Sequence, residues 1–331
     1  MSLSNIFLLT AILLASSGLT GLYRKWALKR LILDIPSERS SHEVPTPRGG
    51  GIAFVLIFYA GLSFLFFRKQ IDRDLFLALA PGSVIAVTGL IEDVKHIRSS
   101  IRLLIQFLCA AAALFFLKGV DSFFGFSLLW FWSLLALVGI VWFTNLYNFM
   151  DGIDGFAAME TISISFALWL FTDVNIFILL AFATGGFLYW NWPKARIFMG
   201  DSGSTTLGFI IAVLGIYLNN KNIFGIQFWI IITSLFWFDA TVTLLRRKFN
   251  NEDLSMPHRN HMYQRAVLGG FSHKMTTIYG FALNLVLVTI AWLLYREHIS
   301  LVVGLISAIL INAAVFWYIE TRYPFVVSKG S

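Results

Sequence analysis

The sequence has few charged residues and a single cysteine. Charged residues make up 13% of the 331 positions, whereas about 25% is usual in a soluble domain, and 58% of the residues are hydrophobic. This composition excludes an ordinary soluble globular fold. The lone Cys109 excludes an intrachain disulfide, so cysteine usage says nothing about the redox compartment. The sequence also lacks a segment of alternating basic and aromatic residues, and we therefore expect no nucleic-acid partner.

Long apolar segments fill most of the chain. A membrane-spanning helix needs about 20 mostly apolar residues, and these segments are too long and continuous for the strands of a barrel. We predict an all-α polytopic membrane protein, one domain over residues 1–331, with about eleven transmembrane helices. The eleven candidates are 3–23, 50–67, 75–92, 101–118, 126–147, 156–172, 174–192, 203–219, 225–245, 276–295 and 299–319.

Basic residues lie mainly on one side of these segments. None precedes the first segment, and the cluster Arg24, Lys25, Lys29 and Arg30 follows it, which favours an uncleaved span over a signal peptide. If the N-terminus is outside, the loops after odd-numbered spans hold 19 of the 25 Lys and Arg residues. The positive-inside rule therefore predicts that these loops face the cytoplasm. Their charge would lie beside anionic headgroups of a bacterial inner membrane and anionic substrates.

A stretch of spaced amides and acids follows the fifth span. Asn145, Asn148, Asp151 and Asp154 are three residues apart, which would place them near one face of a helix. Two glycines in the same stretch allow tight turns or close approach to a ligand. Amide and carboxylate oxygens suit a hard cation such as Mg²⁺. The alternative is a polar helix end with Asx turns.

The segment Gly200–Ser204 immediately precedes the eighth span, at a predicted helix N-terminus. Free N–H groups and the helix dipole favour phosphate there. Asp201 would repel a phosphate unless a cation lay between them, so Asp201 is a candidate metal ligand. An ordinary Asp or Ser N-cap is the alternative.

Acidic residues at or inside the predicted spans are costly unless they have partners. The third span ends with Glu92 and Asp93, which repel one another; a metal ion, Lys95 or Arg98 would relieve the repulsion, and a solvated helix end is the alternative. Deeper acids occur in two other spans, Glu160 and Asp239. For Glu160, function and pairing are equally open, whereas for Asp239 we favour pairing with an arginine or with a polar group on another helix.

Two further loops contain candidate phosphate ligands. His42 and Arg48 lie in the first large loop, and His261 and Arg265 lie in the last one. Each pair has a plain basic loop as its alternative. Five of the six predicted cytoplasmic loops carry polar clusters and the outer loops carry almost none. This one-sided distribution predicts an active site at the cytoplasmic face rather than a conduit through the bilayer.

In combination these motifs resemble the polyprenyl-phosphate N-acetylhexosamine-1-phosphate transferases. The resemblance runs from about Arg39 to about Arg265. Its motifs are Pro-Thr-Pro-Arg-Gly-Gly at 45–50, Glu-Asp at 92–93, Asn-x-x-Asn-x-x-Asp-Gly-x-Asp-Gly at 145–155, and the segment 191–204. Any one of these motifs is weak evidence, but their order along the chain is specific.

The resemblance implies transfer of a sugar 1-phosphate from a UDP-N-acetylhexosamine to undecaprenyl phosphate, with release of UMP and dependence on Mg²⁺, for which Mn²⁺ could substitute. It also implies roles for individual residues. Asn148 and Asp201 would be metal ligands, and Asp151 would lie close by. One of the pair Glu92 and Asp93 would deprotonate the lipid phosphate. The uridine would be bound by Asp154, Asn191 and Phe198, the last by stacking on the base.

The sequence departs from the family at two positions. Glu92 replaces the usual Asp, and the late loop reads His261-Met-Tyr-Gln instead of a His-x-His-His type pattern. The altered loop, together with the form Ser-Ser-His-x-x-Pro-Thr-Pro-Arg-Gly-Gly-Gly at 40–51, resembles the branch that initiates O-antigen in lipopolysaccharide biosynthesis more than the branch for peptidoglycan and cell wall biogenesis. Direct attack by the lipid phosphate is preferred over a covalent intermediate on Asp151, although the sequence fits both.

Other functions and assemblies stay open at this point. A secondary transporter would also have broken helices and intramembrane acids, although Glu160 and Asp239 are the only acids well inside the predicted spans. A CDP-alcohol phosphotransferase would need further spaced Asp residues, which are absent. The sequence does not determine the N-acetylated sugar, and a homodimer is one option that it leaves open.

Overall fold

The computed structural model describes residues 3–36, 44–254, 256 and 258–326. His42, a predicted substrate ligand, lies outside the described residues. The described chain is almost entirely helical, as predicted. Its helices are α1 (Leu3–Arg30), α2 (Gly51–Phe67), α3 (Arg73–Leu79), α4 (Gly82–Val94), α5 (Ser99–Phe116), α6 (Leu129–Phe149), α7 (Phe156–Thr172), α8 (Asn175–Asn191), α9 (Asp201–Asn220), α10 (Ile226–Ile232), α11 (Ser234–Phe249), α12 (Met262–Leu268), α13 (His273–Tyr295) and α14 (Leu301–Arg322).

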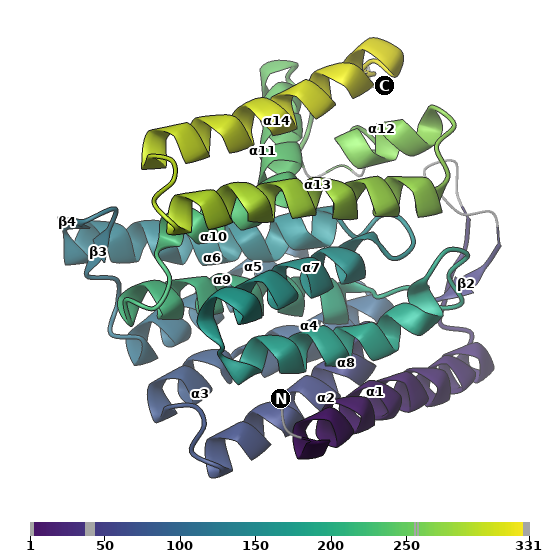
Figure 1. Ribbon diagram of the computed structural model, residues 1–331. Coiled ribbons are helices and arrows are strands. Elements are labelled where there is room, and N and C mark those ends of the chain that lie inside the picture. The colour runs from purple at the N-terminus through teal and green to yellow at the C-terminus, as the bar shows by residue number, and fades with distance from the viewer. Residues whose placement is uncertain (1–2, 37–43, 255, 257, 327–331) are drawn as a thin grey trace.

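Two short antiparallel pairs mark opposite ends of the helix bundle. Strand β1 (Leu33–Asp34) pairs with β2 (Thr46–Pro47), and β3 (Ser122–Phe123) pairs with β4 (Phe126–Ser127). Figure 1 shows β2, α12 and the N-terminal end of α13 at one end of the bundle and the β3–β4 hairpin at the other. The loops that carry the motifs therefore share one end of the molecule.

Every predicted apolar segment is helical, but the count of eleven spans is not confirmed. Among the described residues, seven helices are long and apolar enough to cross a membrane, or up to eight if a bent pair is one span. Three more apolar helices, α2, α7 and α8, have 17 residues each and fall short of the usual length of about 20. The chain is a multi-pass membrane protein in which some helices are too short to be assigned as spans.

The segment 225–245 is predicted as one span, but the structure divides it. Helices α10 and α11 meet at Thr233 with a bend of 74°. The hydroxyl of Thr233 donates to the carbonyl oxygen of Trp229 at 2.9 Å. Thr144 and Thr206 make the same bond within continuous helices, so this bond alone does not account for the bend. Asn312 of α14 donates to Ser234 Oγ at 2.9 Å just beyond the bend. The bend directs α11 toward the late loop.

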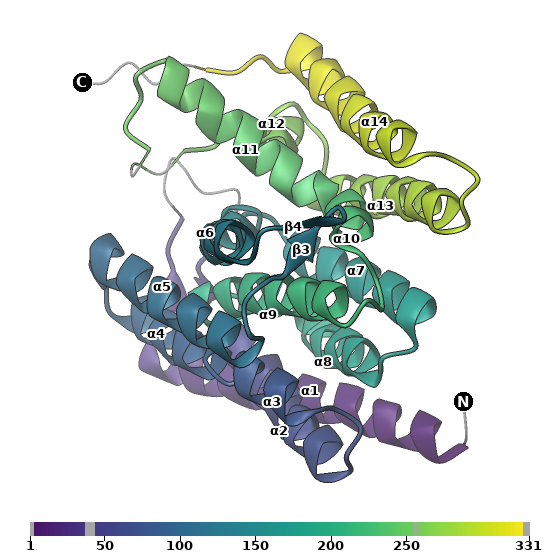
Figure 2. The same cartoon turned by 90° about the vertical axis from the view of Figure 1, so that its left-hand side faces the viewer.

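Helix α9 forms the centre of the bundle. Every residue from Ser202 to Leu218 is buried, and Figure 2 shows neighbouring helices around it. Glycines allow these neighbours to approach closely. A Cβ on Gly208 would come within 2.6 Å of the carbonyl oxygen of Phe143, and one on Gly51 would come within 2.3 Å of the Gly203 Cα. The position of the α9 N-terminus, where Asp201 lies, is fixed by this packing.

Glu160 is deeply buried on α7 and receives a hydrogen bond from Asn284 of α13. The sequence left a functional role and a structural pairing equally open for Glu160, and the structure supplies Asn284 as a pairing partner. The same face of α13 also contacts Asp154, through His273 and Thr277. Helix α13 is thus joined to α7 and to the loop before it by polar contacts.

Candidate active site

The N-terminus of α9 is capped by a carboxylate from another helix. Asp93, at the end of α4, accepts hydrogen bonds from the backbone N–H groups of Asp201 at 3.0 Å and Ser202 at 3.2 Å. These are donors that the first turn of a helix leaves unpaired, and a negative charge is stabilised there. The alternative in which Asp201 caps its own helix is wrong, because Gly200 is the N-cap residue and the cap comes from α4. Asp93 is 4% exposed, and its predicted role as a base stays a prediction.

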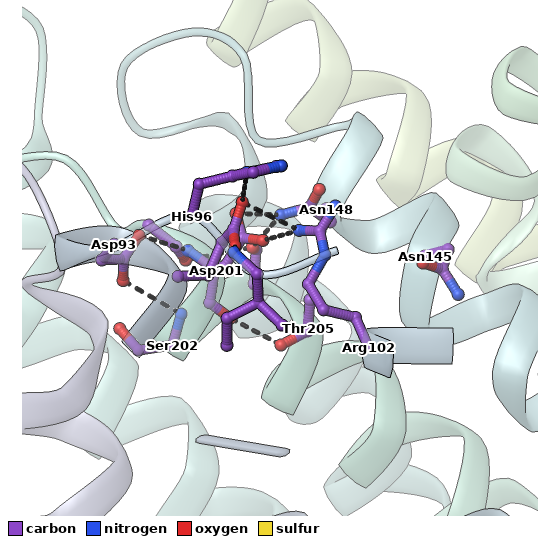
Figure 3. A network of polar contacts seen from close by, with 12 residues as sticks. Asp93, His96, Arg102, Asn145, Asn148, Asp201, Ser202 and Thr205 are labelled. Carbon is purple, nitrogen blue, oxygen red and sulfur yellow. Dashed lines mark hydrogen bonds and ion pairs between the residues drawn. The ribbon is translucent and has the colours of Figure 1, made fainter. Parts of the chain in front are cut away.

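Asp201 is the point where three motifs meet (Figure 3). Its Oδ1 accepts from Asn148 Nδ2 at 2.9 Å, and the same amide donates to Ser204 Oγ at 2.9 Å. Its Oδ2 lies 2.6 Å from Arg102 Nη1. The structure therefore brings together Asn148 and Asp201, the two predicted metal ligands.

Arg102 joins Asp201 to the acidic pair. Its Nη1 lies 3.6 Å from Glu92 Oε1 as well as 2.6 Å from Asp201. Sequence reasoning expected a metal ion, Lys95 or Arg98 to relieve the repulsion at the acidic pair, but in the structure this cation is Arg102. Arg102 and Gln106 are spaced four apart at the start of an apolar helix, and this spacing was the available signal that both face one site.

Glu92 is oriented by the backbone that follows α4. Its Oε2 accepts from the N–H of Ile97 at 2.5 Å, and its Oε1 lies 3.1 Å from His96 Nδ1. Arg48 fixes the same helix end from the first loop, because its Nε donates to the carbonyl of Asp93 at 2.7 Å and its Nη2 to that of Glu92 at 3.3 Å. Cationic groups are favourable at the carbonyl end of a helix. The structure thus places predicted residues Arg48, Glu92 and Asp93 together.

The loop between α6 and α7 carries the other two acids of the central motif. Asp154 Oδ2 accepts from the N–H of Ala195 at 3.0 Å and lies 3.2 Å from His273 Nδ1. Thr277 donates to the Asp154 carbonyl at 3.0 Å. Sequence reasoning missed His273 because it lies outside every recognised motif. Asp154 is therefore held between the 191–204 segment and α13.

Asp151 lies in the same loop as Asp154. Burial, followed by the charges of Asp201, Asp93 and Asp154, raises the pKa of Asp151 well above its usual range. A carboxyl group in such surroundings is stabilised in its charged form by a nearby cation. That Asp151 lies close enough to Asp201 to act with it on one metal ion stays a prediction.

Asn191 and Phe198 both form hydrogen bonds between loops, Asn191 through its side-chain amide and Phe198 through its backbone. The Oδ1 of Asn191 accepts from Gly155 N at 2.9 Å, and its Nδ2 donates to the Ile197 carbonyl at 3.0 Å, so both ends of the amide are used inside the protein. The backbone of Phe198 bonds Pro47 O at 2.8 Å and Gly50 N at 3.0 Å, and its side chain is partly exposed. Contact of either residue with uridine stays a prediction.

The late loop reaches the site through His261 and Tyr263. Tyr263 donates from its hydroxyl to the Phe149 carbonyl at 2.8 Å, and the His261 ring stacks against Phe149. Asp239 of α11 receives the N–H groups of Met262 at 2.8 Å and Tyr263 at 3.3 Å. The favoured interpretation of Asp239 as a structural residue is confirmed, but its partner is the N-terminus of α12 instead of an arginine.

Arg265 lies one turn after His261, on α12, and its side chain is directed toward α14. It is 2% exposed, and its Nη1 lies 2.5 Å from Glu320 Oε2 of α14. The structure brings His261 to the loop of Asp151 but pairs Arg265 with α14. A contact between Arg265 and the substrate is not evident in this arrangement and stays a prediction.

A small cavity beside Asp201 has the chemistry of a cation site. It has a volume of about 60 Å³ and is lined by Arg102, Gln106, Asn145, Asn148 and Asp201, among others. Within the described part of the chain, no three His, Cys, Asp or Glu side chains are grouped so as to hold a metal by themselves. Mg²⁺ is commonly held by one or two carboxylates together with substrate phosphates. Asp201 and its neighbouring amide fit that incomplete shell.

Comparisons with known proteins point to one family. The model of glycosyl transferase family 4 matches residues 75–219. The chain is 31% identical over 281 residues to a probable undecaprenyl-phosphate N-acetylglucosaminyl 1-phosphate transferase of Bacillus subtilis, covering 78% of this chain and 76% of that relative. It is 33% identical over 217 residues to a phospho-N-acetylmuramoyl-pentapeptide-transferase of Thermotoga neapolitana, covering 60% and 69%.

A mycobacterial relative matches the same share of the chain as the Bacillus relative. The chain is 27% identical over 318 residues to a decaprenyl-phosphate N-acetylglucosaminephosphotransferase of Mycobacterium tuberculosis, covering 78% of this chain and 74% of that protein. The family match includes Asp93, Asn148 and Asp201, the residues that meet at the α9 N-terminus.

Proposed function

The chain belongs to the polyprenyl-phosphate N-acetylhexosamine-1-phosphate transferases of glycosyl transferase family 4, and on that premise we propose its reaction in detail. The enzyme transfers an N-acetylhexosamine 1-phosphate from a UDP-sugar to undecaprenyl phosphate and releases UMP. The observation that carries this proposal is the meeting of Asp93, Asn148 and Asp201 at the N-terminus of one buried helix. Asp93 already accepts from the first N–H groups of this helix, so the end offers a diphosphate the positive end of the helix dipole and a carboxylate, Asp201, that can hold a bridging cation.

We propose Mg²⁺ as the cofactor, with Mn²⁺ as a substitute, held by Asp201 and Asn148. When bound, the ion offsets the charge of the diphosphate and polarises the phosphorus under attack. The Asn148 amide would turn its oxygen to the ion, since its nitrogen now donates to Asp201. Asp93 keeps the first turn of α9 in place, and Arg102 supplies a fixed positive charge where the two anionic reactants meet.

The reaction is an in-line displacement at the β-phosphorus of the UDP-sugar. An oxygen of the lipid phosphate forms the new P–O bond, and the bond to the UMP phosphate breaks as UMP leaves. Positioning removes much of the entropic barrier. Direct attack is preferred over a covalent route through Asp151, because a lipid phosphate with a second pKa of about 6 is largely ionised at pH 7 and is already a nucleophile.

The polyprenyl tail needs an apolar path along the bundle. A cavity of about 360 Å³ lies between α6, α9, α10 and α11, and it extends from Phe123, near the β3–β4 end, to Trp142 and Phe143 of α6. Helix α6 also carries Asn148, five residues after Phe143. We propose that this cavity receives part of the isoprenoid chain and so places the lipid phosphate beside the carboxylates.

The sugar and pathway are proposals of the same kind. The names of the Bacillus and Mycobacterium relatives both specify N-acetylglucosamine, which supports UDP-N-acetylglucosamine as the donor. The altered histidine loop supports an O-antigen type of surface polysaccharide. A labelled UDP-sugar should become chloroform-soluble only when undecaprenyl phosphate is present, whereas a transporter would move the label without forming a lipid product.

Glu92→Gln should lower activity by about tenfold and leave turnover that recovers as pH rises. Glu92 is bonded to the Ile97 N–H and lies near Arg102, and a glutamine oxygen can keep the first contact. Since the lipid phosphate needs little deprotonation, Glu92 acts mainly through its charge. Initial rates from pH 6 to 9 provide the measurement. Glu92→Asp, which keeps the charge, is the matched control and should be nearly neutral. If Glu92→Gln folded and still bound UDP-sugar but showed no transfer activity at any of these pH values, Glu92 would instead be the base.

We also propose that the N-terminus is outside and the motif loops are cytoplasmic. Two exposed asparagines that follow helices at opposite ends, Asn222 and Asn251, provide matched test positions. In a Cys109→Ala background, an impermeant reagent added to intact cells should label Asn222→Cys and leave Asn251→Cys unlabelled. Labelling of position 251 without labelling of position 222 would reverse the topology.

A further inference from the structure

A second cavity lies away from the carboxylates, between α12 and the end of α14. It has a volume of about 460 Å³, and its walls include Arg259, Arg265, Arg322 and Tyr323. Figure 1 shows α12 beside the C-terminal end of α14, at the end of the bundle that carries the motif loops. Asn260 donates to the carbonyl of Val326 at 3.0 Å and joins the two walls.

This cavity is strongly cationic. Three arginines line it, and no acidic side chain is among its lining residues in the described part of the chain. Glu320, which pairs with one of these arginines, is shared with a second: it lies 2.5 Å from Arg265 and 2.7 Å from Arg246. Burial, with the charges of His261 and Arg247, lowers the pKa of His258 to about 3. The positive charge therefore comes from arginines and does not change near neutral pH.

Arg265 has donors that its protein neighbours do not use. Its side chain is 97% buried, and Nη1 is bonded to Glu320 and to the Tyr323 carbonyl at 3.0 Å. Its Nε and Nη2 are buried without a hydrogen-bond partner. Unpaired buried donors are unfavourable, particularly on a charged group. An oxyanion is the acceptor that suits a guanidinium edge, because phosphate oxygens can take two N–H groups in parallel.

An apolar groove lies beside the cationic cavity. It has a volume of about 350 Å³ and is walled by α12, α13 and α14, with Leu283 and Tyr318 among its lining residues. Arg322, which lines the cavity, lies 5.5 Å from the ring of Tyr318. On the same helix Trp317 and Tyr318 are 68% and 45% exposed, as in the aromatic belts at membrane surfaces. Charge and apolar surface are thus joined at the depth of the lipid headgroups.

We propose that the cavity between α12 and α14 binds the phosphate headgroup of an anionic membrane phospholipid, with an acyl chain in the adjoining groove. The site is separate from the proposed reaction and does not depend on it. Its occupant would hold α12, whose Tyr263 is bonded to the carbonyl of Phe149 at the end of α6, two residues before Asp151. The lipid would therefore stabilise the segment that carries His261.

Native mass spectrometry of the full-length protein, released from detergent with phosphatidylglycerol or phosphatidylcholine, provides the test. Wild-type protein should retain one phosphatidylglycerol in preference to phosphatidylcholine, and this lipid should raise the thermal unfolding midpoint. Arg322→Gln should weaken phosphatidylglycerol binding by about tenfold. Arg322 is exposed, so this variant should fold even if Arg265→Gln does not.

Arg296→Gln is the matched control. Arg296 also ends a membrane helix and lies 5.9 Å from an aromatic ring, as Arg322 lies 5.5 Å from Tyr318, but it is at the opposite end of the bundle. Its phosphatidylglycerol binding should equal that of wild type. Equal retention of phosphatidylcholine, or unchanged binding in Arg322→Gln, would overturn the proposal. A full stabilising shift from inorganic phosphate alone would show that the ligand is a free anion, and displacement by undecaprenyl phosphate would show an acceptor site; either result would also overturn it.

Discussion

Asp201→Asn should reduce the rate of sugar-phosphate transfer by about a thousandfold, or about 4 kcal/mol of transition-state stabilisation. The carboxylate stands at the N-terminus of α9, where it contacts Arg102 at 2.6 Å and Asn148 at 2.9 Å. Asparagine can keep a hydrogen bond to either neighbour but supplies no negative charge to a divalent cation. Initial rates in purified protein at saturating Mg²⁺ measure the effect.

Asp74→Asn provides the control for this substitution. Asp74 is also in the first turn of a helix and pairs with a cation, Lys118, at 3.1 Å, but it belongs to the opposite end of the bundle. An exposed pair of this kind contributes little, so activity should stay near the wild-type value. If folded Asp201→Asn turned over as fast as Asp74→Asn, the assignment of Asp201 to the metal would be wrong.

Gly89→Ala should abolish most activity, by at least about a hundredfold, although residue 89 has no functional group. A Cβ at Gly89 would lie 2.5 Å from the Asp201 carbonyl carbon and 2.5 Å from Ser202 N. These are backbone atoms of a buried helix, so relief requires α4 and α9 to separate. Separation would lengthen the bonds from Asp93 to the α9 N-terminus and move Asp201 relative to Asn148. A displacement of this kind is costly in a reaction that depends on positioning.

The measurement for Gly89→Ala compares its transfer rate and thermal midpoint with those of Gly18→Ala. Gly18 is also inside a membrane helix, but a Cβ there would meet no atom within 4 Å. Gly18→Ala should therefore retain wild-type activity. Full activity in Gly89→Ala would mean that the α4–α9 contact does not position the site.

Local sequence patterns were sufficient for the long helices and for the grouping of the motifs at one end. Apolar length predicted these helices but not the short helix α12, and the resemblance to a known family marked Asn148 and Asp201 as partners. The bend at Thr233 was not predicted, because the apolar run 225–245 continues across it without a local signal. The predicted segments 50–67, 156–172 and 174–192 agree with α2, α7 and α8 to within a residue at each end, but 17 residues are too few to assign a span by length alone.

The side-chain pairings in the site that the sequence did not reveal are contacts between segments far apart in the chain. Asp93 caps α9 from α4, across 108 positions of the chain. Arg102 and His273 reach Asp201 and Asp154 only because separate helices pack together. Arg265 was predicted as a phosphate ligand from its loop, and the sequence did not reveal that Glu320 of α14 bonds one of its guanidinium nitrogens. Local periodicity in the sequence does not predict these pairings, because each one depends on tertiary packing.

The central claim is that this membrane enzyme transfers a sugar together with its phosphate at the N-terminus of α9. Its most direct test is mass analysis of both products after purified protein, Mg²⁺ and undecaprenyl phosphate are incubated with a panel of UDP-N-acetylhexosamines. The account predicts a lipid that gains one N-acetylhexosamine and one phosphate, with one UMP released for each lipid formed. A lipid that gains the sugar alone, with release of UDP, would contradict it.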